Sequence, residues 1–67
     1  MTMIASTAAE LAAITDAIDR SRQRMADLAR PYLGSERDDI VTAIYEVERT
    51  LLATQRALKR ASRAVER

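Results

Sequence analysis

RPYLGSE, residues 30–36, contains the only proline and the only glycine in a chain of 67 residues. Pro31 cannot continue a helix, because it lacks an amide hydrogen and its ring clashes with the preceding turn. Gly34 can adopt a left-handed backbone conformation without steric cost, and Ser35 is a favourable residue for capping the start of a new helix. The stretch therefore predicts that one helix ends and another begins, with a turn at residues 31–35.

Before this stretch, the pattern of apolar residues predicts a helix over about residues 8–30. Thr7 and Glu10 form the T-x-x-E pattern of a capping box, in which both side chains accept hydrogen bonds from free amides. We therefore expect the helix to begin near Ala8. Its large apolar residues recur at spacings of three and four, which is typical of a heptad seam. These residues are Leu11, Ile14, Ile18, Met25 and Leu28.

After the stretch, a second helix is predicted over about residues 36–64. Its first turn contains Glu36, Asp38 and Asp39, where the helix dipole favours negative charge. The apolar seam of this helix contains Ile40, Ile44, Val47, Leu51, Thr54, Leu58, Ala61 and Val65. A second apolar line beside the seam contains Val41, Tyr45 and Leu52. The other side of the seam has the small residues Ala43, Thr50, Ala57 and Ala64, which would let another helix approach closely.

Two helices joined by so short a connection are expected to be antiparallel neighbours. The sequence therefore predicts an all-α fold, in which a single antiparallel helical hairpin occupies residues 1–67. Tyr32 and Leu33 are expected to fold back over the tip as an apolar plug. If the chain folds back about residue 33, opposite charges face each other in three places. These pairs are Arg20 with Glu46, Arg30 with Glu36, and Glu10 with Arg56.

One hairpin of this size is not expected to be stable alone. Small chains usually need disulfides, a metal ion or oligomerisation, and this sequence has neither cysteine nor histidine. We therefore expect a homodimer that forms a four-helix bundle; a hairpin that docks on a different protein is the alternative. The expected oligomer interface comprises Ile40, Val41, Ile44, Tyr45, Val47, Leu51, Leu52, Leu58, Leu11, Ile14, Ile18, Met25 and Leu28.

The charged residues are nearly balanced, and a formal net charge of +1 predicts neither a nucleic-acid-binding nor a membrane-binding protein. The RSRQR stretch, residues 20–24, has acidic neighbours and is interpreted as a solvated face. The C-terminal basic residues form a candidate anion-binding face, although cations also favour a helix C-terminus without any ligand. These residues are Arg56, Lys59, Arg60, Arg63 and Arg67. Nucleic acid is the less favoured partner, because no aromatic side chain lies among them to stack on bases.

No residue pattern in the sequence predicts catalysis. Adjacent carboxylates such as Asp38 and Asp39 point in different directions on a helix, and neither a nucleophile–base pair nor a set of metal ligands is evident. We therefore expect a protein that is not an enzyme and that uses no cofactor, metal or small-molecule substrate.

The sequence also gives expectations about location and role. The N-terminal residues lack the basic cluster and apolar run of a signal peptide, and the apolar runs are too short to span a membrane. The lack of cysteine fits a reducing cytoplasm. The sequence therefore favours a cytoplasmic interaction module that binds a protein partner, with a nucleic-acid-binding bundle as the alternative.

Overall fold

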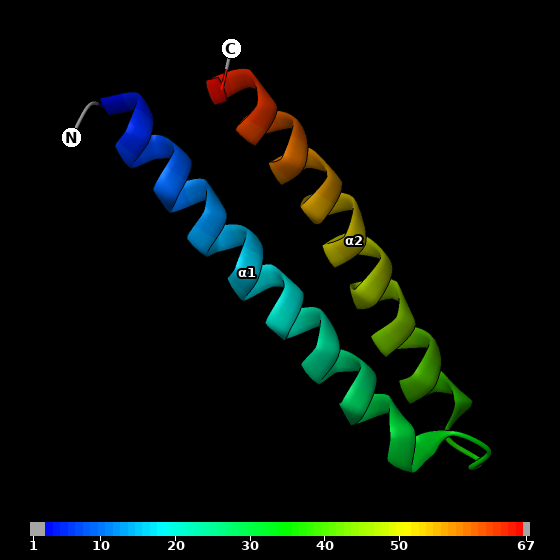
Figure 1. Ribbon diagram of the computed structural model, residues 1–67. Helices are drawn as coiled ribbons and strands as arrows, with labels where there is room; N and C mark the ends of the chain where they lie inside the picture. Colours follow the sequence, from blue (N-terminus) through cyan, green and yellow to red (C-terminus); the bar gives the residue numbers. More distant parts are fainter. Residues whose placement is uncertain (1–2, 67) are drawn as a thin grey trace.

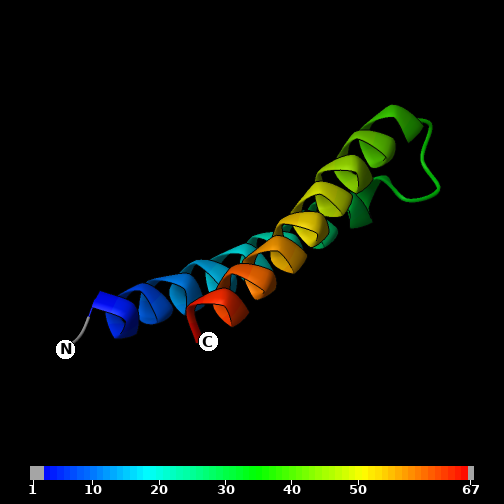
Figure 2. The same cartoon turned by 90° about the horizontal axis from the view of Figure 1, so that it is seen from above.

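The computed structural model describes residues 3–66, which form two long antiparallel helices (Figure 1). Helix α1 comprises Met3–Ala29, a short 3₁₀ helix η1 comprises Arg30–Tyr32, and helix α2 comprises Asp38–Glu66. The two long helices lie side by side in both views (Figures 1 and 2), and the start of α1 and the end of α2 lie at the same end of the molecule. The predicted all-α hairpin is confirmed.

Helix α1 begins earlier than the capping-box pattern predicted. It starts at Met3 rather than near Ala8, and Thr7 lies inside it. The Thr7 hydroxyl donates a hydrogen bond to the Met3 carbonyl oxygen at 2.9 Å. A threonine hydroxyl bonded to the carbonyl four residues earlier is satisfied within a helix and does not cap one. The alanine-rich residues around it have high helix propensity and extend the helix to Met3.

The end of α1 and the turn follow the expected pattern, although α2 begins two residues later than expected. Helix α1 ends at Ala29, and Pro31 lies in the first turn of η1, where its missing amide hydrogen leaves no gap. Gly34 has a positive φ of 74°, and Leu33 N–H donates to the Arg30 carbonyl oxygen at 3.2 Å. Helix α2 begins at Asp38 rather than Glu36.

Ser35 stabilises the turn and does not cap the first turn of α2. Its hydroxyl donates to the Tyr32 carbonyl oxygen at 2.7 Å and accepts from the Arg37 N–H at 3.1 Å. Both hydrogen bonds hold the connection in place before the helix begins. Tyr32 and Leu33 are both exposed, so they do not form the expected plug over the tip.

The register of the hairpin differs from the one expected. Gln55 Nε2 donates a hydrogen bond to Asp19 Oδ1 at 3.2 Å, whereas a fold about residue 33 would place Val47 opposite Asp19. The shift arises because η1 lies beside the beginning of α2 and lengthens the connection. None of the three expected ion pairs between the helices forms among residues 3–66. The ion pairs present are Arg22 with Asp19, Arg30 with Asp27, and Arg37 with Asp39.

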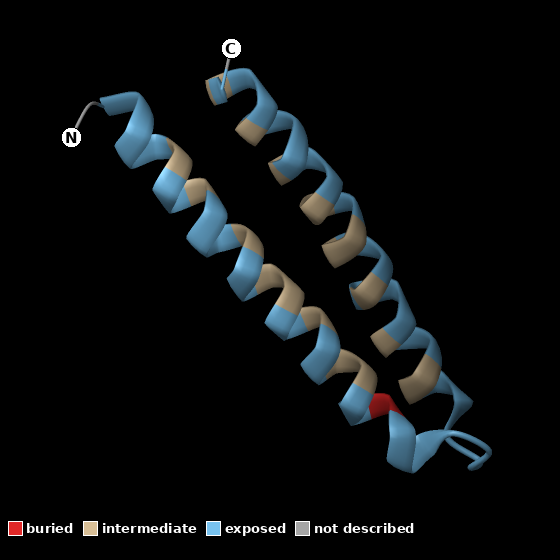
Figure 3. Ribbon diagram, in the orientation of Figure 1, coloured by how far each residue is buried: buried red, intermediate tan, exposed pale blue. Residues whose placement is uncertain are grey.

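The contact between the helices uses one flank of each heptad pattern. Half-buried positions lie on the sides where the helices face each other, and the outer sides are exposed (Figure 3). On α1 these positions include Leu11, Thr15, Ile18, Arg22 and Met25, and on α2 they include Ile44, Glu48, Leu51, Gln55 and Leu58. Ile14, Leu28 and Val47, three members of the apolar seams, are instead 46%, 58% and 42% exposed.

The hairpin is long and thin and lacks an interior. It measures 53 × 16 × 10 Å, and Ala29, which is 2% exposed, is the only buried residue among those described. Its accessible surface is 5275 Å², whereas a compact monomer of 7.5 kDa would expose about 4,200 Å². Within residues 3–66, neither helix has a stretch apolar enough to cross a membrane.

Candidate interaction surface

An apolar groove runs between the two helices on one face of the hairpin. It encloses about 340 Å³ and includes one basic side chain, that of Arg24. Its other lining residues are Ser21, Met25, Leu28, Val47 and Leu51. We call this surface the apolar groove.

The apolar groove exists because the apolar stripe of each helix is wider than the strip that the other helix of the hairpin covers. Ile14, Ser21 and Leu28 are seven residues apart and form one line along α1. The hairpin contact uses the neighbouring positions Thr15 and Arg22, so this line is left on the outside. On α2, the hairpin contact uses Ile44, Glu48 and Leu51, and the neighbouring residue Val47 is left exposed.

A shallow hollow of about 630 Å³ continues from the groove over α2. It is lined by Ala43, Glu46, Val47, Arg49, Thr50 and Leu51. The small residues predicted from the sequence lie here and along the same line of the helix. Thr50 Oγ1 donates to the Glu46 carbonyl oxygen at 3.0 Å, and Thr54 Oγ1 donates to the Thr50 carbonyl oxygen at 2.9 Å. Because these hydroxyls are satisfied within the helix, covering this surface leaves no hydroxyl donor unpaired.

The opposite face of the hairpin is more strongly charged. A hollow of about 410 Å³ there is lined by Arg22, Gln23, Ala26, Tyr45, Glu48, Arg49 and Leu52. Glu48 Oε1 is buried and accepts no hydrogen bond from any described residue. We call this surface the charged face.

The thirteen residues expected at an oligomer interface therefore divide among four places. Met25, Leu28, Val47 and Leu51 line the apolar groove, with the exposed Ile14 on the same line of α1, while Tyr45 and Leu52 line the charged face. Leu11, Ile18, Ile44 and Leu58 are half-buried along the contact within the hairpin, and Ile40 and Val41 are half-buried near the tip. The heptad pattern predicts Ser21 as a weak position of the seam, although it was not among the expected interface residues. Arg24 was not assigned to this surface from the sequence, although its position beside Leu28 places it there.

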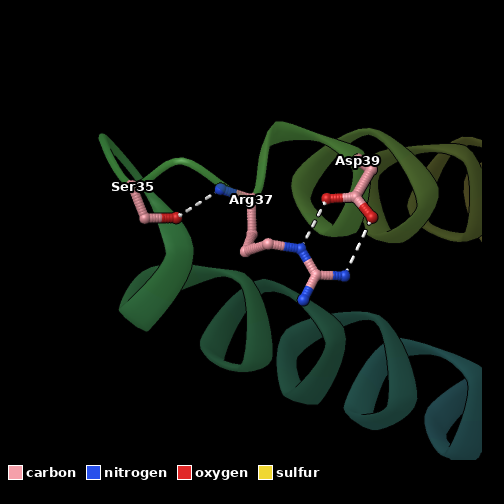
Figure 4. Close-up of polar contacts among 3 residues, drawn as sticks. All are labelled: Ser35, Arg37 and Asp39. Atoms are coloured by element: carbon pink, nitrogen blue, oxygen red, sulfur yellow. Dashed lines mark hydrogen bonds and ion pairs between the residues drawn. The ribbon is translucent and has the colours of Figure 1, made fainter.

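The tip contains the shortest ion pair among residues 3–66. Arg37 Nε and Nη2 donate to the two carboxylate oxygens of Asp39 at 3.0 Å each (Figure 4). These hydrogen bonds lower the pKa of Asp39 and raise the pKa of Arg37. Both side chains are exposed, and neither lines the apolar groove. The pair therefore orders the start of α2 and is not part of the candidate surface.

The candidate anion-binding residues lie in the basic second half of α2. Arg56, Lys59, Arg60 and Arg63 are exposed, and none of them forms an ion pair with a described residue. Arg67 lies outside the described residues. Comparison of the chain with known protein families, curated proteins and solved structures finds no match.

Proposed function

We propose that the hairpin is a non-catalytic interaction module whose apolar groove binds a second copy of the chain to form a four-helix bundle. The observation that carries this proposal is the groove itself, because the apolar side chains of Leu28 and Val47 are exposed there beside Met25 and Leu51. Contiguous apolar surface of this kind is typical of a protein–protein contact.

The amount of uncovered surface supports the same proposal. The hairpin exposes about 1,000 Å² more than a compact monomer of its mass would expose. A standard protein–protein interface covers about 800 Å² on each partner. One additional copy is therefore enough to cover the excess.

In such a dimer the charged face remains available to another protein. Tyr45 and Arg49 lie there, and both residue types are enriched among the side chains that dominate binding energy at interfaces. Self-association through the groove and binding of a protein partner on the charged face are therefore compatible.

Thermal unfolding at several protein concentrations tests the proposal. Because association stabilises only the folded state, the Tm of a dimer rises with protein concentration. We expect a clear rise over about a hundredfold range of concentration. A Tm that is independent of concentration would contradict self-association.

A nucleic-acid-binding bundle is the second candidate function, favoured by the basic residues Arg56, Lys59, Arg60 and Arg63, which have no ion-pair partner in residues 3–66. Contacts of these side chains with phosphates would make binding strongly salt-dependent. Binding of RNA or DNA with a steep salt dependence, lost when residues 59–67 are removed, would support this candidate. Absence of binding at low salt would exclude it.

A further inference from the structure

We infer that the second copy docks with its tip at the same end as the first, so that α1 of each chain packs on α2 of its partner. This inference rests on the proposed self-association through the apolar groove. Two arrangements bring the two grooves face to face. A two-fold axis parallel to the helices places the tips together and pairs α1 with α2, whereas a perpendicular axis places the tips at opposite ends and pairs each helix with its own copy. Neighbouring helices are antiparallel in both arrangements.

The sizes of the side chains favour the arrangement with the tips together. On the α1 side the groove is lined by Leu28, and Ile14 lies on the same line of the helix. On the α2 side, beyond Val47, the surface carries the small residues Ala43 and Thr50, and Ala57 lies on the same line. Pairing α1 with α2 gives each of the two interfaces one edge of each kind, so the two interfaces are equivalent and have the same helix spacing. Pairing like helices would place large against large on one side and small against small on the other, so the two interfaces would need different helix spacings.

The register of the hairpin carries over to this arrangement. A two-fold axis parallel to the helices keeps every residue at its own level, so the hydrogen bond between Asp19 and Gln55 also fixes which residues of the two copies meet. Leu28 lies beside the partner's Val47, and Ser21 lies beside the partner's Thr54. The apolar seam of α1 in one copy and that of α2 in the other therefore have matching heptad positions along the whole length over which they pack.

The charges at the edges of the groove favour the same arrangement. Arg24 lies at the α1 edge and Glu46 at the α2 edge. With the tips together, the partner's Glu46 lies about one helical turn from the level of Arg24, and the partner's Arg60 lies about one turn from the level of Glu10. The long side chains of these residues can span one turn. None of these four residues forms an ion pair within residues 3–66, so each is available to a partner.

The opposed arrangement would bring like charges together. Its axis would pass near Ser21, because Ile14 and Leu28 are equally spaced about that residue. Arg24 of each copy would then lie only three residues from the axis, and these two like charges on the groove edge would repel each other. The distribution of charge therefore separates the two arrangements, although both cover the groove.

A distance measurement between the two tips tests the inference. Glu36→Cys places a spin label on an exposed residue of the connection, outside both long helices. With the tips together, helix spacings of 8–10 Å predict a label-to-label distance of about 20–30 Å. With the tips opposed, the distance approaches the 53 Å length of the hairpin. A long distance in a dimer overturns the inference but not the proposed self-association, whereas a monomeric mass in the same sample overturns the proposed self-association.

Charge reversal provides a second, independent test. Arg24→Glu places like charges beside the partner's Glu46, so we expect about tenfold weaker dimerisation at low salt. The double variant Arg24→Glu with Glu46→Arg restores the opposite charges and is expected to restore most of the affinity. Arg20→Glu is the matched control, because Arg20 lies further from the groove edge and its reversal is expected to change the affinity little. An unchanged or tighter Arg24→Glu dimer, or a double variant as weak as the single one, would overturn the inference.

Discussion

The apolar groove and the charged face are made by the same two helices, and each includes a large side chain of α2 that is about equally exposed. Val47 on the groove side is 42% exposed and Tyr45 on the charged face is 46% exposed, although they are only two residues apart. They differ in their surroundings. Val47 lies beside Met25, Leu28 and Leu51, whereas Tyr45 lies among arginine, glutamine and glutamate side chains. The exposure of a single apolar residue therefore does not identify a surface that requires a partner. The side chains around that residue do, because apolar neighbours form a continuous apolar surface and charged neighbours do not.

The largest effect is expected at Leu51, which belongs to both the contact within the hairpin and the apolar groove. Leu51→Asp places an unpaired charge in both contacts. We expect the free energy of unfolding to fall by about 3 kcal/mol or more, which is enough to unfold so small a chain. Circular dichroism would then show loss of helix at room temperature. Ile44→Asp, which lies in the hairpin contact, is expected to behave in the same way. A variant that remains dimeric and equally heat-stable would show that the seam is assigned wrongly.

Val47→Asp and Tyr45→Asp test the comparison directly. Both residues are about equally exposed on the same helix, so an aspartate costs either hairpin little by itself. Covering the groove with a partner would bury the Val47→Asp carboxylate, at a cost of several kcal/mol. We expect Val47→Asp to abolish dimerisation, as measured by sedimentation equilibrium, and Tyr45→Asp to leave it nearly unchanged. Equal effects of the two variants would show that the two faces do not differ as described.

Gly34 lies in the tip, outside both faces, and has a positive φ of 74°. No atom lies within 4 Å of the place where a Cβ would be, so Gly34→Ala introduces backbone strain and no clash. We expect a loss of about 1 kcal/mol in the free energy of unfolding, measured with urea.

A chemically synthesised chain with D-alanine at position 34 is the matched control. D-alanine prefers a positive φ, so it should be at least as stable as the natural chain. If the L- and D-alanine chains are equally stable, the left-handed turn does not contribute to the stability of the hairpin.

The smallest effect is expected for Asp39, whose pKa is lowered by Arg37 below its ordinary value of 3.8. Because the folded state lowers this pKa, the stabilising contribution is present above the ordinary pKa and is lost as the pH falls through the folded-state pKa. The Tm of the natural chain should therefore fall slightly more between neutral and strongly acidic pH than that of Asp39→Asn. The effect is small because both side chains are exposed. Identical pH profiles for the two chains would show that the pair does not stabilise the start of α2.

The architecture of the chain could be predicted from its sequence because its helix-breaking residues are concentrated in one place. Pro31 and Gly34 interrupt two heptad-patterned segments, and no other proline or glycine competes with them. The hairpin and its approximate tip follow from those residues and from the spacing of the apolar side chains.

The register and the orientation of the two faces could not be predicted in the same way. The contact within the hairpin includes Arg22, Glu48 and Gln55, polar residues that a search for apolar positions does not assign to a seam. The lengths of their side chains let apolar stems pack between the helices. The length of the connection also depends on hydrogen bonds of Ser35 that the sequence alone does not specify. These two features decide which flank of each helix remains exposed as the apolar groove.

The mass of the chain in solution tests the central claim most directly. Sedimentation equilibrium at micromolar concentration should give twice the chain mass of 7.5 kDa, with Val47→Asp returning the mass to that of one chain. A natural chain that is fully helical, resistant to heat and monomeric at that concentration would contradict the claim, because the apolar groove would then be stable without a second copy to cover it.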